Sequence, residues 1–368
     1  MKNACIVLRN CKDSLSATDY IAVTDEFLLG GYSFDEVRFL TQHDDAPLRG
    51  ALNALLKEFE NIALLLPQTL LSAGKTLCAE MNLGEFSQGT AAGAGYFSAN
   101  GKTLFLLACD DFESGEKYVK GVCVPYLNQK YNVRFDRMTF RFMGASDELV
   151  GKTVMEARRA CGDAIKFSRR RRYDEDIIHL TYDGQVPKMT VDDVARLFAK
   201  NLEENLYALE DISIEKQLVQ LLTVRGKKIS VAESFTGGGI AKRITSVSGA
   251  SKVYFEGLNT YDEGSKIKRL GVREYTLRMN GAVSDQTAYE MAAGLMATGD
   301  CDVSVATTGI AGPFSDGTDA PVGLAYIAVG TAERVFVYQY KFNGTREQIT
   351  ERAINYALFQ AYKHLKKI

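Results

Sequence analysis

The sequence predicts an α/β protein built from more than one domain, and three observations carry this prediction. The chain has 368 residues, whereas a usual domain has ~100–200. Short apolar runs of strand length alternate with stretches whose apolar residues recur at helical spacing. A serine- and glycine-rich turn joins one such run directly to a helix at residues 231–239. This alternation is typical of mostly parallel sheets covered by helices.

Composition excludes several classes of protein. The sequence is 46% hydrophobic and 24% charged, as in an ordinary globular protein. Its net charge of −2 does not attract nucleic acid or anionic membranes by bulk charge. No run approaches the ~20 apolar residues that a membrane span needs, so we expect no membrane association and a cytoplasmic protein. The 7 cysteines and 3 histidines are scattered, which predicts reduced thiols and no metal site.

Residues 1–130 form the first predicted domain. The apolar runs at 4–8, 62–66 and 104–109 have the length of buried strands, and leucines between 48 and 56 share one helix face. The stretch 88–101 is rich in glycine, alanine and serine, which predicts a loop rather than a core element. The sequence therefore predicts an α/β domain here.

Residues 131–208 form a predicted small α+β module. Residues 133–143 and 176–182 have strand patterns, whereas 147–161 and 190–205 have helical ones. Four arginines at 169–172 are able to contact nucleic-acid phosphates, but with three acidic residues close behind them they are typical of a solvated face. The module also lacks the Gly-x-x-Gly clamp of an RNA-binding module, so nucleic acid is not an expected partner.

Residues 209–368 form the third predicted domain. An apolar stripe over 214–222 predicts a helix that ends at Gly226, and Ser284 suits the N-cap of another helix. A terminal helix is predicted from about 345 to 363. Strand patterns occur at 228–232, 253–261, 301–307, 322–329 and 335–342.

The strand-to-helix junction around Ser234 is the first candidate site. A serine at a strand end is held by the backbone, while Thr236, Gly237 and Gly238 allow a ligand to approach closely. Amides at a helix N-terminus are able to face an anion or a developing oxyanion. A tight crossover turn without function explains the same residues equally well at this point.

Lys266 is the candidate base for Ser234. Tyr261 ends a predicted strand and Lys266 follows in the next turn or helix, within reach of Ser234 if the two strands are neighbours. A serine hydroxyl needs a base, and a lysine serves when burial lowers its pKa. Because no histidine lies near the junction, a Ser–Lys pair is favoured over Ser–His–Asp. The alternative is an exposed helix lysine.

A second turn at residues 307–313 (TTGIAGP) contains Thr308 and Gly309 directly after a predicted strand. Hydroxyls and amides at such a sheet edge are where α/β proteins bind ligands. A turn that needs only glycine geometry is the alternative interpretation.

Six motifs occur together in the order seen in one family. They are AESFTGG (232–238), Thr260-Tyr261 with Lys266, GAVS (281–284), TGIAGP (308–313), PVG (321–323) and GTR (344–346). Over residues 214–368 the chain resembles the competence/damage-inducible protein A (CinA) family. The C-terminal domain of that family has the nicotinamide-nucleotide amidase fold, here expected as a three-layer α/β domain.

The resemblance implies deamidation of nicotinamide mononucleotide to nicotinate mononucleotide with release of ammonia, in a homodimer without a cofactor. It carries the nucleophile onto Ser234, the base onto Lys266 and a supporting role onto Tyr261. Thr236, Gly237, Gly238, Thr308 and Gly309 would supply site hydroxyls and amides. Arg346 is the candidate for the substrate phosphate, since phosphates favour arginine.

The upstream segments resemble the same family's molybdopterin-cofactor-binding-like domain (1–130) and its small KH-like module (131–208). The expected glycine-rich loop is replaced by PQTLLS at 67–72, and an expected Pro-Gly-x-Pro turn by CDDF at 109–112. Without those glycines the backbone cannot cradle a phosphate in the same way. We therefore expect a catalytically silent scaffold or dimerisation element.

Departures from the family pattern support a second hypothesis. Asp262-Glu263-Gly264 replaces Ser-Asn-Glu, Ala320 replaces a lysine and Phe235 replaces a cysteine. Acidic groups beside Lys266 favour its charged form and oppose its role as a base. The second hypothesis is a catalytically lapsed nucleotide-binding or scaffold protein that touches DNA through its arginine run.

Overall fold

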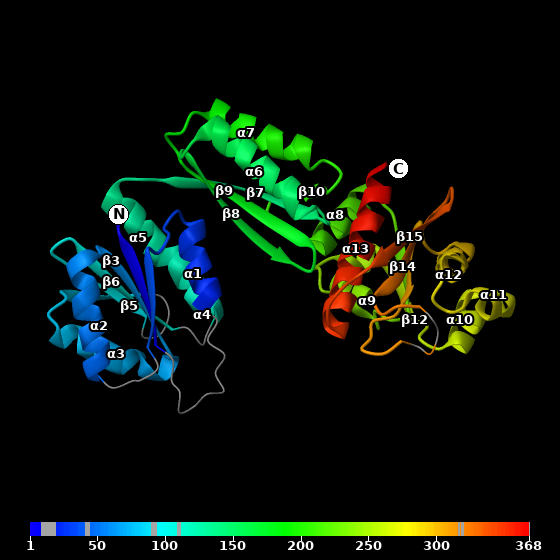
Figure 1. Ribbon diagram of the computed structural model, residues 1–368, viewed down its shortest axis with the longest axis horizontal. Coiled ribbons are helices and arrows are strands. Elements are labelled where there is room, and N and C mark those ends of the chain that lie inside the picture. Colours follow the sequence, from blue (N-terminus) through cyan, green and yellow to red (C-terminus); the bar gives the residue numbers. More distant parts are fainter. Residues whose placement is uncertain are drawn as a thin grey trace. The chain divides into compact units, whose positions relative to one another are not determined.

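The computed structural model describes residues 1–8, 20–40, 45–89, 94–108, 112–315, 317 and 320–367. The chain forms two compact units, the first made of residues 1–137, 162–168 and 179–188 and the second of the remainder. Within the described residues the strands form three sheets flanked by helices (Figure 1). The predicted α/β class is confirmed, whereas the boundaries at 130/131 and 208/209 stay predictions.

The first unit contains a six-stranded sheet in the order β2-β1-β3-β6-β5-β4. Strands β1, β2, β3 and β6 pair in parallel, and β4 and β5 continue the sheet in antiparallel pairing. The strands are β1 (Asn3–Leu8), β2 (Glu36–Leu40), β3 (Asn61–Leu66), β4 (Glu85–Gln88), β5 (Gly95–Ala99) and β6 (Lys102–Ala108). The helices are α1 (Tyr20–Leu29), α2 (Asp45–Glu58), α3 (Leu71–Glu80), α4 (Phe112–Tyr118) and α5 (Val124–Tyr131).

Two cores lie on the opposite faces of this sheet because successive strand residues point to opposite sides. Ile6 and Leu64 belong to the core that includes residues of α2 and α3. Val7 and Leu65 belong to the core that includes residues of α1 and α5. The first unit is therefore layered helix, sheet, helix.

The prediction of a loop at 88–101 is wrong at residues 95–99, which form strand β5. Phe97 is only 2% exposed and packs in the core under α2 and α3. Asn100 and Gly101 have φ of 51° and 77°, the conformation that turns one strand tightly into the next. Gly95 is the first residue of β5, and Gly101 lies in the hairpin turn between β5 and β6. Residues 90–93 lie outside the described part of the chain.

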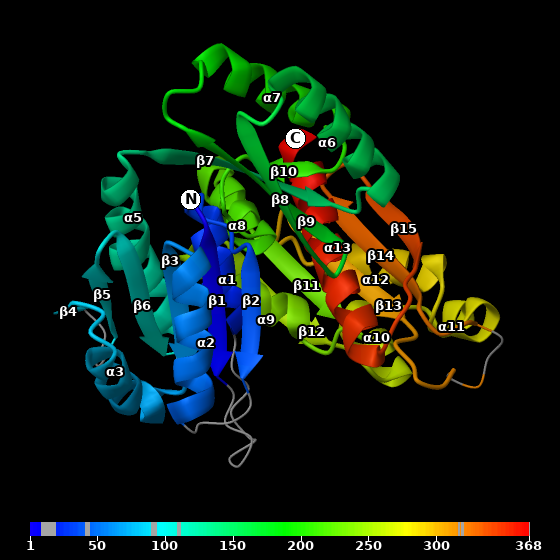
Figure 2. The same ribbon diagram turned by 60° about the vertical axis from the view of Figure 1, so that its left-hand side comes forward.

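The second sheet has four strands in the order β10-β7-β9-β8. Helices α6 (Asp147–Cys161) and α7 (Lys188–Asn201) lie along one of its faces (Figures 1 and 2), and Phe198 of α7 stacks on Phe140 of β7. The helix predicted at 147–161 is α6. The strands are β7 (Phe135–Met143), β8 (Ile165–Arg172), β9 (Glu175–Asp183) and β10 (Leu206–Ala208).

The third sheet has the order β12-β11-β13-β14-β15. Its first three strands pair in parallel, whereas β13–β14 and β14–β15 are antiparallel. The strands are β11 (Ile229–Glu233), β12 (Tyr254–Asn259), β13 (Val303–Gly309), β14 (Leu324–Thr331) and β15 (Val335–Lys341). The helices are α8 (Ile214–Arg225), α9 (Gly239–Thr245), α10 (Glu263–Leu270), α11 (Glu274–Asn280), α12 (Asp285–Ala297) and α13 (Arg346–Lys367).

Helices cover both faces of this sheet, which confirms the predicted three-layer arrangement. Val231 and Val305 pack in a core with residues of α8, α9 and α13. Ala232 and Ala306 pack in a second core with residues of α10, α11 and α12. Gly226 ends α8 with φ 62°, and the Ser284 hydroxyl accepts a hydrogen bond from the Thr287 amide at the start of α12, both as predicted.

Candidate functional site

The carboxyl ends of β11, β12 and β13 lie side by side at one edge of the third sheet. In the parallel register Glu233, the last residue of β11, stands opposite Asn259 of β12 and Thr307 of β13. Ser234 directly follows β11, and α10 begins four residues after β12 ends. The sheet therefore brings the chain around Ser234 next to the helix that carries Lys266.

Lys266 and Ser234 are in hydrogen-bond contact. The lysine Nζ lies 3.1 Å from the serine Oγ. Lys266 is only 1% exposed and Ser234 8% exposed, so water reaches neither freely. The structure thus brings together two residues that the sequence placed in one site, and the alternative of an exposed lysine is excluded.

Two backbone carbonyls complete the surroundings of the lysine amine. Nζ donates to the Thr260 carbonyl at 2.8 Å and to the Tyr261 carbonyl at 3.0 Å. A neutral amine has two N–H donors and one lone pair, whereas an ammonium has three donors. Because both carbonyls only accept, a neutral Lys266 has its lone pair left for the Ser234 hydroxyl. A charged Lys266 would instead donate to all three oxygens.

Burial lowers the pKa of Lys266 from its ordinary value. The charges of Glu263 and Asp262 act in the opposite direction, but burial is the largest influence and the pKa remains lowered. Asp262 also caps α10, because its Oδ1 accepts from the Gly264 amide at 2.8 Å. The acidic residues therefore act as the sequence indicated, and burial outweighs them.

Glu233 is a site residue that the sequence reasoning missed. It is 1% exposed, and its carboxylate accepts hydrogen bonds from the amides of Gly238, Ile240 and Ala241 at 2.8–3.1 Å. A carboxylate at a helix N-terminus is favourable because it meets the positive end of the helix dipole. An acidic residue just before a glycine-rich helix start was the available signal.

This cap changes which amides are able to face an anion. The Gly238 amide is bonded to Glu233, and the Gly237 amide donates to the Ser234 carbonyl at 3.1 Å. The expectation that these two amides are free is wrong. Gly237 and Gly238 instead supply positive φ angles of 62° and 92°, which glycine adopts without strain. Among the described residues none accepts from the amides of Phe235 and Thr236.

The predicted threonine hydroxyls are buried and already engaged. Thr236 Oγ1 lies 2.7 Å from Thr307 Oγ1, and Thr308 Oγ1 donates to the Ala282 carbonyl at 2.6 Å. Thr308 and Gly309 are the last residues of β13 rather than part of the following turn, because they pair with β14. Thr308 and Gly309 therefore contribute strand backbone to the site, and the turn expected at 307–313 begins only after Gly309.

Tyr261 and Arg346 meet at the rim of the site. The Tyr261 ring is 61% exposed, and its hydroxyl accepts from Arg346 Nη2 at 3.3 Å. Arg346 Nη1 donates to the Gly312 carbonyl at 2.8 Å. Tyr261 thus meets Lys266 through its carbonyl, while its phenol and Arg346 link the ends of β12 and β13.

All four arginines of the run 169–172 are exposed, as the sequence predicts for a solvated face. Two of them also pair with acidic residues. Arg169 bonds to Asp176 and to Asp147, each at 2.6 Å. Arg171 bonds to Asp147 at 2.9 Å.

Over the residues that the structure describes, histidine, cysteine and acidic side chains nowhere gather in threes suited to hold a metal ion. None of the helices in these residues combines the length and the apolar character that crossing a membrane requires.

The fold and the site define an α/β protein with a buried serine–lysine pair at the carboxyl ends of parallel strands. Residues 211–365 match the family model described as the CinA C-terminal domain. The chain is 34% identical over 276 residues to a relative from Caldicellulosiruptor saccharolyticus whose name places it among the competence-damage inducible proteins, covering 74% of this chain and 67% of that one. The chain belongs to the CinA family.

A second relative and a solved structure have names of the same family. A CinA-like protein of Kosmotoga olearia is 32% identical over 273 residues, with 73% of this chain and 66% of that protein covered. The matches therefore span about two thirds of the length of these two relatives. The crystal structure of the competence/damage inducible protein CihA from Agrobacterium tumefaciens is 34% identical, covers 42% of this chain and 93% of its own, and has a TM-score of 0.40.

Proposed function

We propose that this protein is an amidohydrolase that converts nicotinamide mononucleotide to nicotinate mononucleotide and ammonia, a step of pyridine-nucleotide salvage. The observation that carries the proposal is the 3.1 Å contact between Lys266 Nζ and Ser234 Oγ, with two carbonyls holding the other lysine protons. The choice of substrate rests on the family motifs. The chemistry of the pair, an acyl transfer, rests on the contacts.

In the acylation step Ser234 attacks the carboxamide carbon of the substrate. Neutral Lys266 takes the hydroxyl proton as the new Oγ–C bond forms and the carbonyl π electrons move onto oxygen. The tetrahedral intermediate then collapses and the C–N bond breaks. The ammonium of Lys266 returns its proton to the departing nitrogen, so that ammonia leaves and an ester on Ser234 remains.

The Phe235 and Thr236 amides are the proposed oxyanion donors. They directly follow the nucleophile, and no described residue accepts from them. Loss of one such donor typically costs about 3–4 kcal/mol of transition-state stabilisation. Glu233 holds the amides of Gly238, Ile240 and Ala241, so the turn keeps one orientation while charge develops.

Deacylation uses the same groups in reverse. Water attacks the ester carbon and Lys266 accepts its proton. The lysine then protonates Ser234 Oγ as the C–O bond breaks, which restores the neutral amine and leaves the product as a carboxylic acid. The acid gives its proton to the ammonia or to solvent and becomes nicotinate mononucleotide.

Arg346 is the proposed partner of the substrate phosphate. It lies exposed, and a guanidinium has five N–H donors, of which the Gly312 carbonyl and the Tyr261 hydroxyl use two. The remaining donors suit a phosphate. A silent scaffold role for residues 1–130, a homodimer and a cytoplasmic location stay predictions.

The test measures ammonia and nicotinate mononucleotide after the full chain is incubated with nicotinamide mononucleotide, nicotinamide riboside or free nicotinamide. We expect release from the mononucleotide, with kcat/KM about tenfold or more lower for the riboside, because one charge-assisted contact is lost. Release that Ser234→Ala leaves unchanged contradicts the mechanism. No release by the wild-type protein favours the lapsed, scaffold hypothesis.

A further inference from the structure

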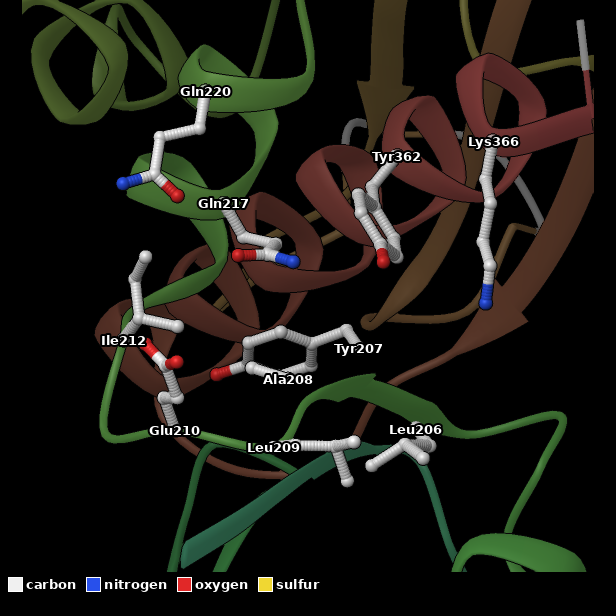
Figure 3. Close-up of a pocket in the computed structure, with 10 residues that line it drawn as sticks. All are labelled: Leu206, Tyr207, Ala208, Leu209, Glu210, Ile212, Gln217, Gln220, Tyr362 and Lys366. Carbon is white, nitrogen blue, oxygen red and sulfur yellow. The ribbon is translucent and has the colours of Figure 1, made fainter.

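A cavity of about 410 Å³ lies in the second unit, away from the residues of the proposed reaction. Strand β10 with the segment after it, helix α8 and the C-terminal end of α13 form its walls (Figure 3). None of its lining residues belongs to the turns around Ser234 or Lys266. Its volume falls in the ~300–1,000 Å³ range of small-molecule sites.

Tyr362 of α13 supplies the first sign of a ligand. The residue is only 7% exposed, and its hydroxyl points into the cavity (Figure 3). In the part of the chain that the structure describes, the hydroxyl has no hydrogen-bond partner. The hydroxyl faces the open space of the cavity, where it is able to donate a hydrogen bond to a bound ligand or accept one from it.

Two glutamines of α8 supply a hydrogen-bonding edge. Gln217 and Gln220 are three residues apart, which puts them on the same helix face, and both line the cavity. Their side-chain amides, like the Tyr362 hydroxyl, bond to no other described residue. Each amide offers a donor and an acceptor together, which is the pattern that pairs with the edge of a nucleobase.

Charges of opposite sign stand on opposite sides of the cavity. Lys366 projects from the last turn of α13, and Glu210 lies on the facing side (Figure 3). No described residue forms an ion pair with either side chain. Leu209, which is 56% exposed, and Ile212 give an apolar surface beside them. A ligand with an anionic end, a polar planar end and a flat apolar face fits this lining.

We propose that this cavity is a second binding site that takes a mononucleotide. Lys366 and Tyr362 bind its phosphate, because an ammonium and a phenol both donate to phosphate oxygens. The amides of Gln217 and Gln220 bind the edge of the base, and Glu210 accepts from its amino group. This site does not depend on the proposed amidase activity.

The test is equilibrium dialysis of the full chain with adenosine 5′-monophosphate, which has no carboxamide for Ser234 to attack. We expect saturable binding that weakens about tenfold or more in Lys366→Gln and in Tyr362→Phe. Lys367→Gln is the matched control, because Lys367 is the next residue of the same helix but does not line the cavity. It should bind as the wild type does.

Adenosine and inorganic phosphate are measured alongside. Each should bind more weakly than the mononucleotide, because each reaches only one end of the cavity. Absence of saturable binding overturns the proposal. Binding that neither Lys366→Gln nor Tyr362→Phe weakens also overturns the proposal, because the mononucleotide then lies elsewhere. An equal loss of binding in Lys367→Gln overturns it as well, because the loss then reflects only a general effect of charge.

Discussion

A lysine acts as a base only in its neutral form, and burial favours that form at Lys266. Burial lowers its pKa, while Glu263 and then Asp262 raise it by a smaller amount. The neutral fraction falls as pH drops through the lowered pKa, so the proposed deamidation should be lost on the acidic side. In the unfolded chain the lysine keeps its ordinary pKa and binds more protons, so stability rises with pH between the two values.

Glu263→Gln tests this balance. Removing the acidic charge with the larger influence lowers the pKa of Lys266 further, so the acidic limb of kcat/KM for deamidation should move to lower pH. Asp262→Asn is the matched comparison, because asparagine keeps the N-cap of α10 while the smaller of the two influences is lost. The measurement is a pH–rate profile of the three proteins. A limb that moves to higher pH in Glu263→Gln would show that Lys266 is not the base.

At this scale the sequence predicts side chains better than it predicts backbone amides. Ser234 and Lys266 are predictable because each follows a strand, and parallel neighbours end at one edge. Glu233 had a signal in its place just before the glycine-rich helix start, but which backbone amides are bonded was not predictable. Whether an amide is free depends on which side chain folds back onto it, and nothing in the spacing of Gly237 and Gly238 shows the carboxylate that binds there.

Among the elements, α10 depends on close contact with α12. A Cβ added at Gly294 of α12 would lie 2.0 Å from the carbonyl oxygen of Leu270, the last residue of α10. This glycine therefore lets the two helices approach and sets the position of the helix that carries Lys266.

Gly294→Ala should lower the free energy of unfolding by about 1–3 kcal/mol through overpacking, and should slow ammonia release by moving Lys266. Gly151→Ala in α6 is the control, because the added methyl there meets no atom within 4 Å. That change should stabilise by about 0.8–1.0 kcal/mol, the difference in helix propensity. Denaturant unfolding measures both. Equal effects would show that the contact between α10 and α12 does not limit stability.

The order of strands and helices in the third sheet follows from the sequence, within about two residues at most ends. Gly226 and Ser284 mark helix ends through local chemistry, so they were predictable. The hairpin at β5 was not, because its strands are short and its glycines and alanines weaken the alternation. Its assignment depends on pairing with β6, which is a contact in space.

In the molecule as a whole, an ion-pair network joins the four-stranded sheet to α13. Asp176 is fully buried against Arg169 and Arg171. At the turn between β8 and β9, Asp174 pairs with Arg352 of α13 at 3.3 Å. The network lies within the second unit. Because Arg169 and Arg171 are paired in this network, fewer arginines of the run remain for the DNA contact of the second hypothesis.

Asp176→Ala should lower the free energy of unfolding by about 3 kcal/mol, because it leaves two partly buried arginines without a buried carboxylate. Asp193→Ala removes an exposed pair with Arg196 and should cost about 0.5 kcal/mol or less. Thermal unfolding of both variants checks the difference. A loss for Asp176→Ala as small as that for Asp193→Ala would mean that the network adds little.

The measurement that tests the central claim most directly is a double-mutant cycle on ammonia release from nicotinamide mononucleotide. The proteins are the wild type, Ser234→Ala, Lys266→Met and the double variant, with folding checked by circular dichroism. If the two residues act as one unit, each single change should reduce kcat by about 10³-fold or more, and the double variant should be no slower than Ser234→Ala. Losses that multiply, or a Ser234→Ala variant as fast as the wild type, would contradict a serine nucleophile activated by Lys266.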